Sequence, residues 1–189
     1  EQTPGWYRAG WSGFVPQGHR PPPPVIGPPA NLGVTGAGVG IAVIDSGVDL
    51  GHIDLRTSST CFDAFGGDCS DDSGHGTHVS GVAAALANGI GVVGAAPSAT
   101  IYAVKVLDAE QGGGDSHLLA GIEWVLANAR AVTPPIRVAN LSLGRRGDIE
   151  DNLALRRSIQ ALIDSGIVVI TSAGNDPDIS AANQILASY

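Results

Sequence analysis

The sequence predicts an α/β domain in which a parallel sheet carries helices on both faces. Short apolar runs rich in β-branched residues indicate strands that are buried on both sides. Between these runs lie longer stretches whose apolar residues recur at helical spacing. Strands that alternate with helices in this way are typical of parallel sheets, because each helix returns the chain to the starting edge of the next strand.

The predicted strands are apolar over most of their length and end beside polar residues. They cover residues 41–44, 101–107, 137–143 and 167–171. Asp45 directly follows the first strand, and Asn175 comes shortly after the fourth. Because active sites on parallel sheets lie beyond the carboxyl ends of the strands, we expect these polar residues at one edge of the sheet.

Three helices are predicted, over residues 75–86, 116–129 and about 150–163. The second has one apolar face that would pack on the sheet, formed by Leu118, Leu119, Ile122, Val125 and Leu126. Asp148 precedes the third helix and is a candidate for its N-cap.

The first 40 residues are predicted to be an N-terminal segment with a Pro-rich insertion. Prolines occur at positions 21–24 and 28–29. Because proline fits neither a helix interior nor a central strand, this stretch is expected to be an irregular, polyproline-like surface segment. The folded domain is therefore expected to begin at residue 41.

The composition is that of a globular domain that can bury a core. The chain has 189 residues, of which 43% are hydrophobic and 15% are charged. Its formal net charge of −8 argues against nucleic acid or an anionic membrane surface as a partner. No apolar run approaches the length of a membrane span. Methionine is absent, which we interpret as the mark of a processed or excised chain.

Two cysteines, Cys61 and Cys69, flank a polar loop with a Gly-Gly turn. A disulfide between them would stabilise the fold by roughly 2–3 kcal/mol and would indicate an oxidising compartment. We therefore expect a secreted or extracellular protein. Two free thiols are the alternative. A zinc site formed with His75 and His78 is a second alternative, although the spacings fit no common zinc finger.

An aspartate at a strand end followed by a histidine at a helix start is the pattern of a catalytic pair. Asp45 could orient an imidazole and stabilise its charged form, or it could accept backbone N–H bonds from its own turn. His75 lies between two glycines that leave its ring accessible, as a general base requires, although a lone histidine at this position could simply be solvated. His78, one turn further on, is interpreted as structural.

Four motifs together resemble the subtilisin-like serine proteases, the subtilase family, from Gln2 to about Asn175. These motifs are Ile44-Asp45-Ser46-Gly47, Gly74-His75-Gly76-Thr77-His78-Val79, Asn140-Leu141-Ser142-Leu143-Gly144 and Ser172-Ala173-Gly174-Asn175. The resemblance implies a subtilisin-like α/β fold that lacks its C-terminal third, with residues 41–189 as the N-terminal part of the catalytic domain. The family's nucleophile lies in a Gly-Thr-Ser-x-Ala motif beyond this point, so the serine is expected on a segment absent from this chain.

The resemblance also implies roles for individual residues. Asp45 and His75 would be catalytic, with a hydrogen bond between them, and Asn175 would donate its amide to the oxyanion. The peptide would lie between two backbone segments, Gly112, Gly113 and Gly114 on one side and Ser142, Leu143 and Gly144 on the other. One wall of the pocket for the residue before the scissile bond would be Ser172, Ala173 and Gly174. By local pattern alone, Asn175 could be a turn residue and the glycine run a mobile loop.

A structural calcium site is implied as well. Its ligands would be oxygens of Gln2, Asp54, Leu86, Asn88, Ile90 and Val92. The alternative is an ordinary loop at a helix end without an ion. The glycine-rich stretch at residues 36–40 looks like part of a dinucleotide motif, but it precedes a strand instead of following one, which argues against nucleotide binding.

The predicted function is that of a serine endopeptidase acting through a Ser-His-Asp acyl-enzyme route. The chain by itself is expected to be inactive, because none of its serines lies in a Gly-Thr-Ser-x-Ala context. The alternative is a non-catalytic subtilase-like domain that binds peptides. Expected partners are a peptide or protein substrate, the complementary C-terminal segment with the serine, and a propeptide or inhibitor.

Overall fold

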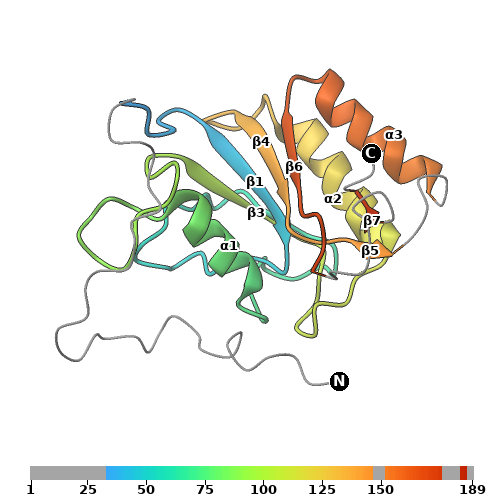
Figure 1. Cartoon of the computed structure of the whole chain (residues 1–189), viewed down its shortest axis with the longest axis horizontal. Helices are drawn as coiled ribbons and strands as arrows, with labels where there is room; N and C mark the ends of the chain where they lie inside the picture. The colour runs from blue at the N-terminus through green and yellow to red at the C-terminus, as the bar shows by residue number, and fades with distance from the viewer. Residues whose placement is uncertain (1–32, 147–151, 176–183, 187–189) are drawn as a thin grey trace.

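The computed structural model describes residues 33–146, 152–175 and 184–186. Its centre is a five-stranded, all-parallel sheet in the order β2-β3-β1-β4-β6 (Figure 1). These strands are β1 (Gly40–Asp45), β2 (Phe62–Asp63), β3 (Thr100–Lys105), β4 (Ile136–Leu141) and β6 (Val168–Thr171). A second, antiparallel pair consists of β5 (Arg145–Arg146) and β7 (Gln184–Ile185).

Helices cover both faces of the sheet, as the sequence predicted. They are α1 (His75–Ala84), α2 (Asp115–Asn128) and α3 (Leu153–Asp164). Because side chains alternate along a strand, Ile41 and Val43 of β1 face the cluster on the α1 side, while Ala42 and Ile44 face the cluster on the α2 and α3 side. The α/β fold class is therefore confirmed (Figure 1).

Burial on both faces explains why the central strands are apolar without interruption. Every residue of β1 and of β3 is buried. The largest fully buried side chain, Tyr102 on β3, donates its hydroxyl to the carbonyl of Pro134 at 2.7 Å. A polar atom at this depth needs such a partner, because leaving it unpaired would cost free energy.

Some predicted boundaries are shifted. The helix α3 begins at Leu153, and its N-cap is Asn152, whose side chain accepts a hydrogen bond from the Leu155 amide at 2.9 Å. The expectation that Asp148 caps this helix is therefore wrong, and asparagine is an equally good capping residue. The strand predicted over residues 101–107 is β3 and ends at Lys105. Beyond it, the amides of Val106 and Leu107 both donate to the carbonyl of Asp45. The Pro-rich insertion lies outside the described residues.

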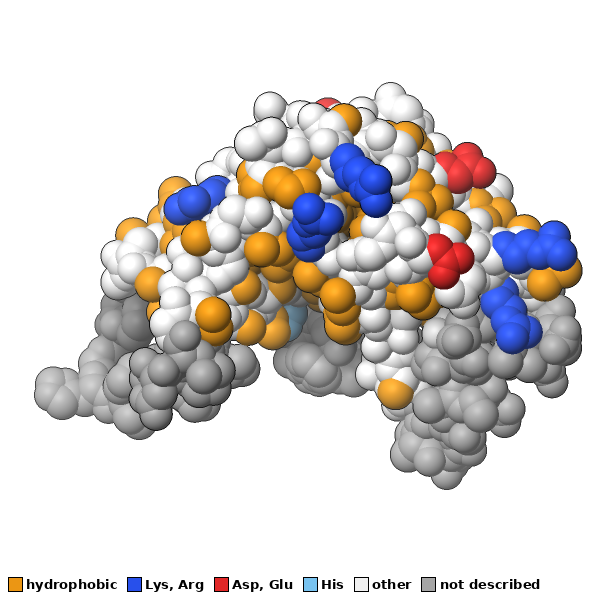
Figure 2. Space-filling model, turned by 90° about the horizontal axis from the view of Figure 1, so that it is seen from above, with side chains coloured by type: hydrophobic (Ala, Val, Ile, Leu, Met, Phe, Trp, Pro, Cys, Tyr) orange, Lys and Arg blue, Asp and Glu red, His pale blue; other side chains and the backbone are white. Residues whose placement is uncertain are grey.

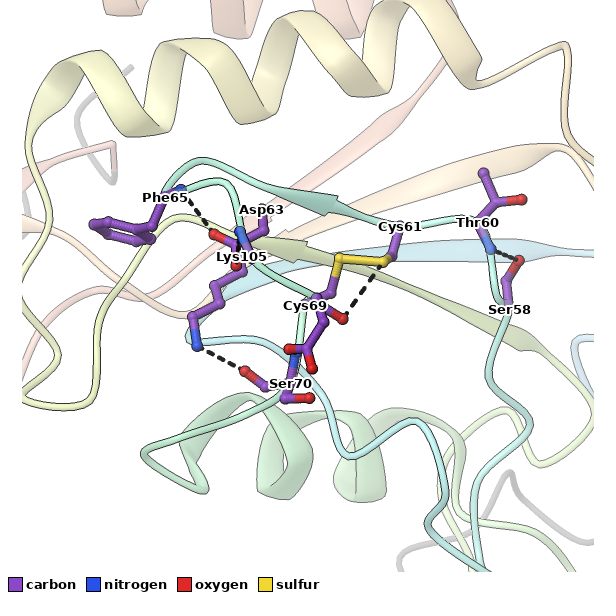
Figure 3. Close-up of a disulfide and its surroundings, with 10 residues drawn as sticks. Ser58, Thr60, Cys61, Asp63, Phe65, Cys69, Ser70 and Lys105 are labelled. Atoms are coloured by element: carbon purple, nitrogen blue, oxygen red, sulfur yellow. Dashed lines mark hydrogen bonds between the residues drawn. A yellow bond between two sulfur atoms is a disulfide. The ribbon is translucent and has the colours of Figure 1, made fainter.

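The predicted disulfide joins Cys61 and Cys69 with their Cα atoms 6.3 Å apart (Figure 3). It ties the start of β2 to the loop that leads into α1. Because both sulfurs are used in this bond, the alternatives of free thiols and of a zinc site containing them are wrong. Cys69 is buried, and its carbonyl accepts a hydrogen bond from Val48 at 3.1 Å, so the loop is held against the end of β1.

The two ends of the sheet differ in how well they are covered. At the β2 end, Phe62 stacks on Trp124 of α2 with ring centroids 6.1 Å apart. At the β6 end, Val168 and Ile170 are 57% and 49% exposed. Figure 2 shows the face seen from above in Figure 1, where hydrophobic side chains reach the surface between charged ones. Within the described ranges, no helix has the length and hydropathy of a bilayer span.

Candidate active site

Asp45 is the last residue of β1 and points to the α1 side of the sheet. The side chain is fully buried. Its Oδ1 atom accepts a hydrogen bond from the amide of Ser46 at 2.7 Å. Among the described residues, Oδ2 has no hydrogen-bond partner. A carboxylate this deeply buried requires compensation, because an unpaired charge in a core is very costly.

His75 is the first residue of α1 and supplies that compensation. Its Nδ1 atom lies 2.7 Å from Oδ1 of Asp45, so the predicted hydrogen bond is present. Because a carboxylate only accepts, Nδ1 carries the proton and donates it. The other ring nitrogen, Nε2, is then left as an acceptor. The His75 side chain is 20% exposed, and a partner group can therefore approach it from the surface.

A glycine allows the first turn of α1 to approach β1 this closely. A Cβ atom on Gly76 would overlap the carbonyl oxygen of Gly47 and would lie 3.2 Å from the Cβ of Asp45. Gly76 is therefore required for steric reasons, whereas Gly74 before His75 has a left-handed φ of 87° and no crowding at its Cβ position. Any larger residue at position 76 would push His75 away from Asp45.

The surroundings raise the pKa of His75 above its ordinary value. The largest cause is the hydrogen bond to Asp45, which favours the charged imidazolium. Burial acts in the opposite direction, while the negative charges of Asp45 and Asp71 add to the increase. The imidazole is thus a stronger base than a free histidine.

The sequence interpretation missed two charged residues beside this pair. Asp71 lies in the loop before α1 and accepts hydrogen bonds from Ser46 Oγ and Thr77 Oγ1, at 2.8 and 2.6 Å. Lys105, at the end of β3, is buried and donates to the carbonyl of Ser70 at 2.6 Å (Figure 3). It also donates to Asp72 Oδ2 at 2.5 Å. An acidic residue a few positions before a helix is a possible cap, which is the signal that could have indicated Asp71.

The segments predicted to bind a peptide follow the strand ends. Gly112, Gly113 and Gly114 are exposed between β3 and α2, and Ser142, Leu143 and Gly144 follow β4. Ser172, after β6, donates its amide to Leu141 and its hydroxyl to Leu143, both at 3.3 Å. Because β3, β4 and β6 are parallel, the three segments leave the sheet at the same edge.

An ion pair joins two of these segments. Arg145, directly after Gly144, donates from Nε and Nη2 to the two carboxylate oxygens of Asp115, at 3.2 and 3.0 Å. Asp115 is the first residue of α2 and directly follows Gly114. Asn152 donates to the same carboxylate at 2.6 Å. The hydrogen bonds from Arg145, opposed by burial and aided by Asn152, lower the pKa of Asp115.

Asn175 follows the end of β6 by four positions and is exposed. Gly174 before it has a φ of 89°, a left-handed value that allows the chain to turn at this point. The preceding residues of the predicted pocket wall, Ser172 and Ala173, are exposed as well. The oxyanion donor predicted from the sequence thus lies on a turn at the sheet edge where the strands carrying Asp45 and Leu141 end.

Several predicted calcium ligands lie together near the end of α1. Asp54 is buried, and its Oδ1 atom has no hydrogen-bond partner among the described residues. Its Oδ2 accepts from the amide of Val92 at 3.4 Å, and its carbonyl accepts from Leu86 at 3.0 Å. Asn88 Oδ1 accepts from Ile90 within the same loop at 2.9 Å. A buried carboxylate oxygen without a partner fits a hard cation. Gln2 lies outside the described residues.

The sequence matches a known protein family. Residues 36–188 match the family described as the subtilase family. The chain is 44% identical to subtilisin E of Bacillus subtilis (strain 168) over 146 residues, which is 76% of this chain and 36% of that protein.

Other curated relatives give similar values. The chain is 43% identical to a subtilisin of Bacillus pumilus over 146 residues, covering 76% of this chain and 50% of that protein. It is 40% identical to subtilisin Savinase of Lederbergia lenta, with 77% of this chain and 51% of that protein aligned. The chain therefore spans between about a third and a half of the length of the curated relatives it matches.

Proposed function

Since the chain belongs to the subtilase family, we propose that it is part of a serine endopeptidase in which Asp45 and His75 are two members of the catalytic triad. The observation that carries this proposal is the 2.7 Å contact between His75 Nδ1 and Asp45 Oδ1. It fixes the tautomer in which Nε2 of His75 is free to accept a proton.

The reaction is acyl transfer. Nε2 of His75 takes the proton of a serine hydroxyl as the oxygen attacks the peptide carbonyl, and later gives that proton to the leaving amine. Asp45 holds the ring in position and stabilises the imidazolium formed between these two steps. Asn175 donates its side-chain amide to the oxyanion of the tetrahedral intermediate. Water then releases the acyl group by the same proton transfers in reverse order.

The nucleophilic serine comes from residues outside these 189. None of the serines in the sequence lies in a Gly-Thr-Ser-x-Ala motif. The exposure of Val168 and Ile170 on β6 supports an additional segment that packs at this end of the sheet, because exposed apolar side chains on an unpaired strand favour association. The chain by itself is accordingly inactive, and its uncovered apolar surface favours association with the complementary segment.

The substrate is a peptide in extended conformation. Its backbone pairs with the exposed Gly112–Gly114 segment on one side and with the Ser142–Gly144 segment on the other. Residues 172–174 form a wall of the pocket for the side chain before the scissile bond. Because these side chains are small, they leave space in the pocket for the substrate side chain.

Calcium is the proposed structural ion. Asp54, Asn88 and the carbonyl groups of Leu86, Ile90 and Val92 would hold it, together with Gln2. When bound, calcium supplies positive charge to the buried Asp54 carboxylate and links the residue 86–92 loop to the body of the domain. The disulfide and the relatedness to subtilisins support a secreted protein.

A fluorophosphonate probe applied to the intact protein tests the proposed function. We expect it to label one serine outside residues 1–189 and to lose this reaction when His75→Ala removes the base. Labelling of a serine within these residues would contradict the assignment. Binding of peptides without labelling or hydrolysis would instead establish a peptide-binding domain without catalytic activity.

A further inference from the structure

The carboxylate of Asp71 lies between the two elements that carry Asp45 and His75. Its Oδ1 accepts from Ser46 Oγ at 2.8 Å, from the Gly74 amide at 2.8 Å and from the Ser73 amide at 3.2 Å. Its Oδ2 accepts from the amide and the hydroxyl of Thr77, at 2.8 and 2.6 Å. Both oxygens thus accept hydrogen bonds from groups of the β1 turn, of the loop before α1 and of the first turn of α1.

These contacts bracket the catalytic pair in the sequence. Ser46 directly follows Asp45, and its Oγ also accepts from the amide of Gly76, directly after His75, at 3.0 Å. One carboxylate therefore joins the residue next to Asp45 to residues on both sides of His75. Asp45 and His75 are 30 positions apart, so their contact depends on how these two elements are held together.

Asp71 also replaces a missing cap on α1. The N-cap residue, Gly74, has no side chain to accept the free amides of the first turn. Asp71 accepts from Gly74 itself and from Thr77 instead. A negative charge at the N-terminal end of a helix is favourable, because the free N–H groups and the helix dipole are positive there.

We propose that Asp71 is a positioning residue for the Asp45–His75 pair, which holds the first turn of α1 on the Ser46 turn and keeps Nδ1 of His75 on Asp45. The expected loss of activity rests on the proposed function, whereas the expected change in the pKa of His75 does not.

The electrostatics agree with this role. Burial opposes ionisation of Asp71, but the hydrogen bonds from Thr77, Ser46 and Gly74 outweigh it, so the pKa of Asp71 is lowered. Asp71 is therefore negatively charged at neutral pH and contributes to the raised pKa of His75, after the larger contribution of Asp45. The nearby cation on β3, Lys105, is paired with Asp72.

The test is Asp71→Asn in the intact protein, with Asp68→Asn as the matched control. Asp68 lies in the same loop and has the same charge, but its carboxylate is exposed and accepts from the amide of Ser70 at 3.0 Å. We expect Asp71→Asn to lower the pKa of His75, measured by NMR titration of the imidazole. We also expect kcat to fall by roughly tenfold to a hundredfold, because small displacements of a catalytic group have effects of this size. The KM of Asp71→Asn should change little. In the Asp68→Asn control, kcat and the pKa of His75 should also change little.

A purely structural cap would give a different result. Asp71→Asn would then lower the melting temperature but leave kcat unchanged, and the pKa of His75 would fall only through the lost charge of Asp71; this result would overturn the proposal. The NMR titration needs no substrate, so a protein without peptidase activity would disprove the proposed function and still test the effect of Asp71 on His75.

Ser46→Ala is a second variant in case Asp71→Asn does not fold. It keeps the charge of Asp71 but removes the hydroxyl that links Asp71 to the β1 turn. We expect kcat to fall and the pKa of His75 to fall with it, because a loosened contact with Asp45 removes the largest cause of the raised pKa although the charge of Asp71 is kept. A folded Ser46→Ala protein with unchanged kcat would refute the positioning role.

Discussion

The two regions that the proposed mechanism needs are held in very different ways. Asp45 is completely buried, and the side chain of His75, which bonds to it, is only 20% exposed. Asn175 and the residues before it are exposed. Two hydrogen bonds of 3.3 Å, from Ser172 to the carbonyls of Leu141 and Leu143, hold this turn against the end of β4. The hydrogen bonds that hold Asp45 and His75 together thus come from residues 45–77, whereas the turn with Asn175, the proposed oxyanion donor, is exposed.

The largest expected effect comes from the buried region. His75→Ala in the intact protein should lower kcat on the order of 10⁶-fold, the size known for the histidine of a subtilisin. The loss corresponds to roughly 8 kcal/mol of activation free energy. Peptide hydrolysis by the purified variant measures it, with circular dichroism as a check of folding. Retention of more than a hundredth of the activity would remove His75 from the mechanism.

The exposed region should give a smaller effect. Asn175→Ala is expected to lower kcat by about 10²–10³-fold, which is the effect of removing one oxyanion donor from a subtilisin. Because Asn175 is exposed, its loss should leave the melting temperature unchanged. A variant with full activity would show that another group stabilises the oxyanion, and a strongly destabilised variant would show that the turn is structural.

The difference between the regions also explains what could be predicted from the sequence. All four long strands and all three helices were predicted to within three residues, because burial on both faces leaves an unbroken apolar signal. The short strands β2, β5 and β7 have no such signal, since two residues carry no periodicity. Asp45 and His75 were predicted because each lies in a motif at the end of an element.

Asp71 could not be assigned in the same way. Its role depends on Ser46, which lies 25 positions away and is brought near by the fold. The same holds for the pair of Arg145 and Asp115, which are 30 positions apart. A charged residue near a loop usually lacks a fixed partner, and only the tertiary structure shows that these residues are paired. The predicted N-cap of α3 was wrong because Asp148 and Asn152 are both suitable capping residues, and the helix uses Asn152.

Calcium removal tests a third region, the loop at residues 86–92. If Asp54 helps to bind calcium, EDTA should lower the melting temperature, because an ion bound to the folded state at a hundred times its Kd stabilises it by about 2.7 kcal/mol. The Asp54→Asn variant should not respond to EDTA. Asp49→Asn, an exposed acidic residue nearby, is the control and should respond like the unmodified protein. An EDTA response that survives in Asp54→Asn would place the ion elsewhere.

The contact between His75 and Asp45 predicts a pH dependence of stability with a definite sign. Because the pKa of His75 is raised in the folded state, its stabilisation is fully present below the pKa of an unfolded histidine, about 6.5. It is lost as the pH rises through the folded-state pKa. Activity should change in the opposite direction through the same window, since the base must be unprotonated.

Urea unfolding at a series of pH values measures this effect, with His75→Gln as the comparison. The variant should lack the decrease in stability over that window. An identical pH dependence in both proteins would show that the decrease comes from another group. The exposed His78 provides a control, because His78→Gln removes a histidine from the same helix without removing the contact to Asp45.

The smallest expected effect concerns the ion pair of Arg145 and Asp115, which joins the two segments proposed to bind the peptide. Both side chains are substantially exposed, at 44% and 37%, so the pair should contribute at most about 1 kcal/mol to stability. Asp115→Asn keeps the size of the side chain and removes its charge. We expect a change in melting temperature that shrinks at high salt, because exposed charges are screened. If the pair also sets the spacing between the two segments, KM for an extended peptide should rise in this variant while kcat for a single-residue ester substrate stays the same. Equal changes for both substrates would mean that the pair acts on the whole domain and does not set the spacing between the two segments.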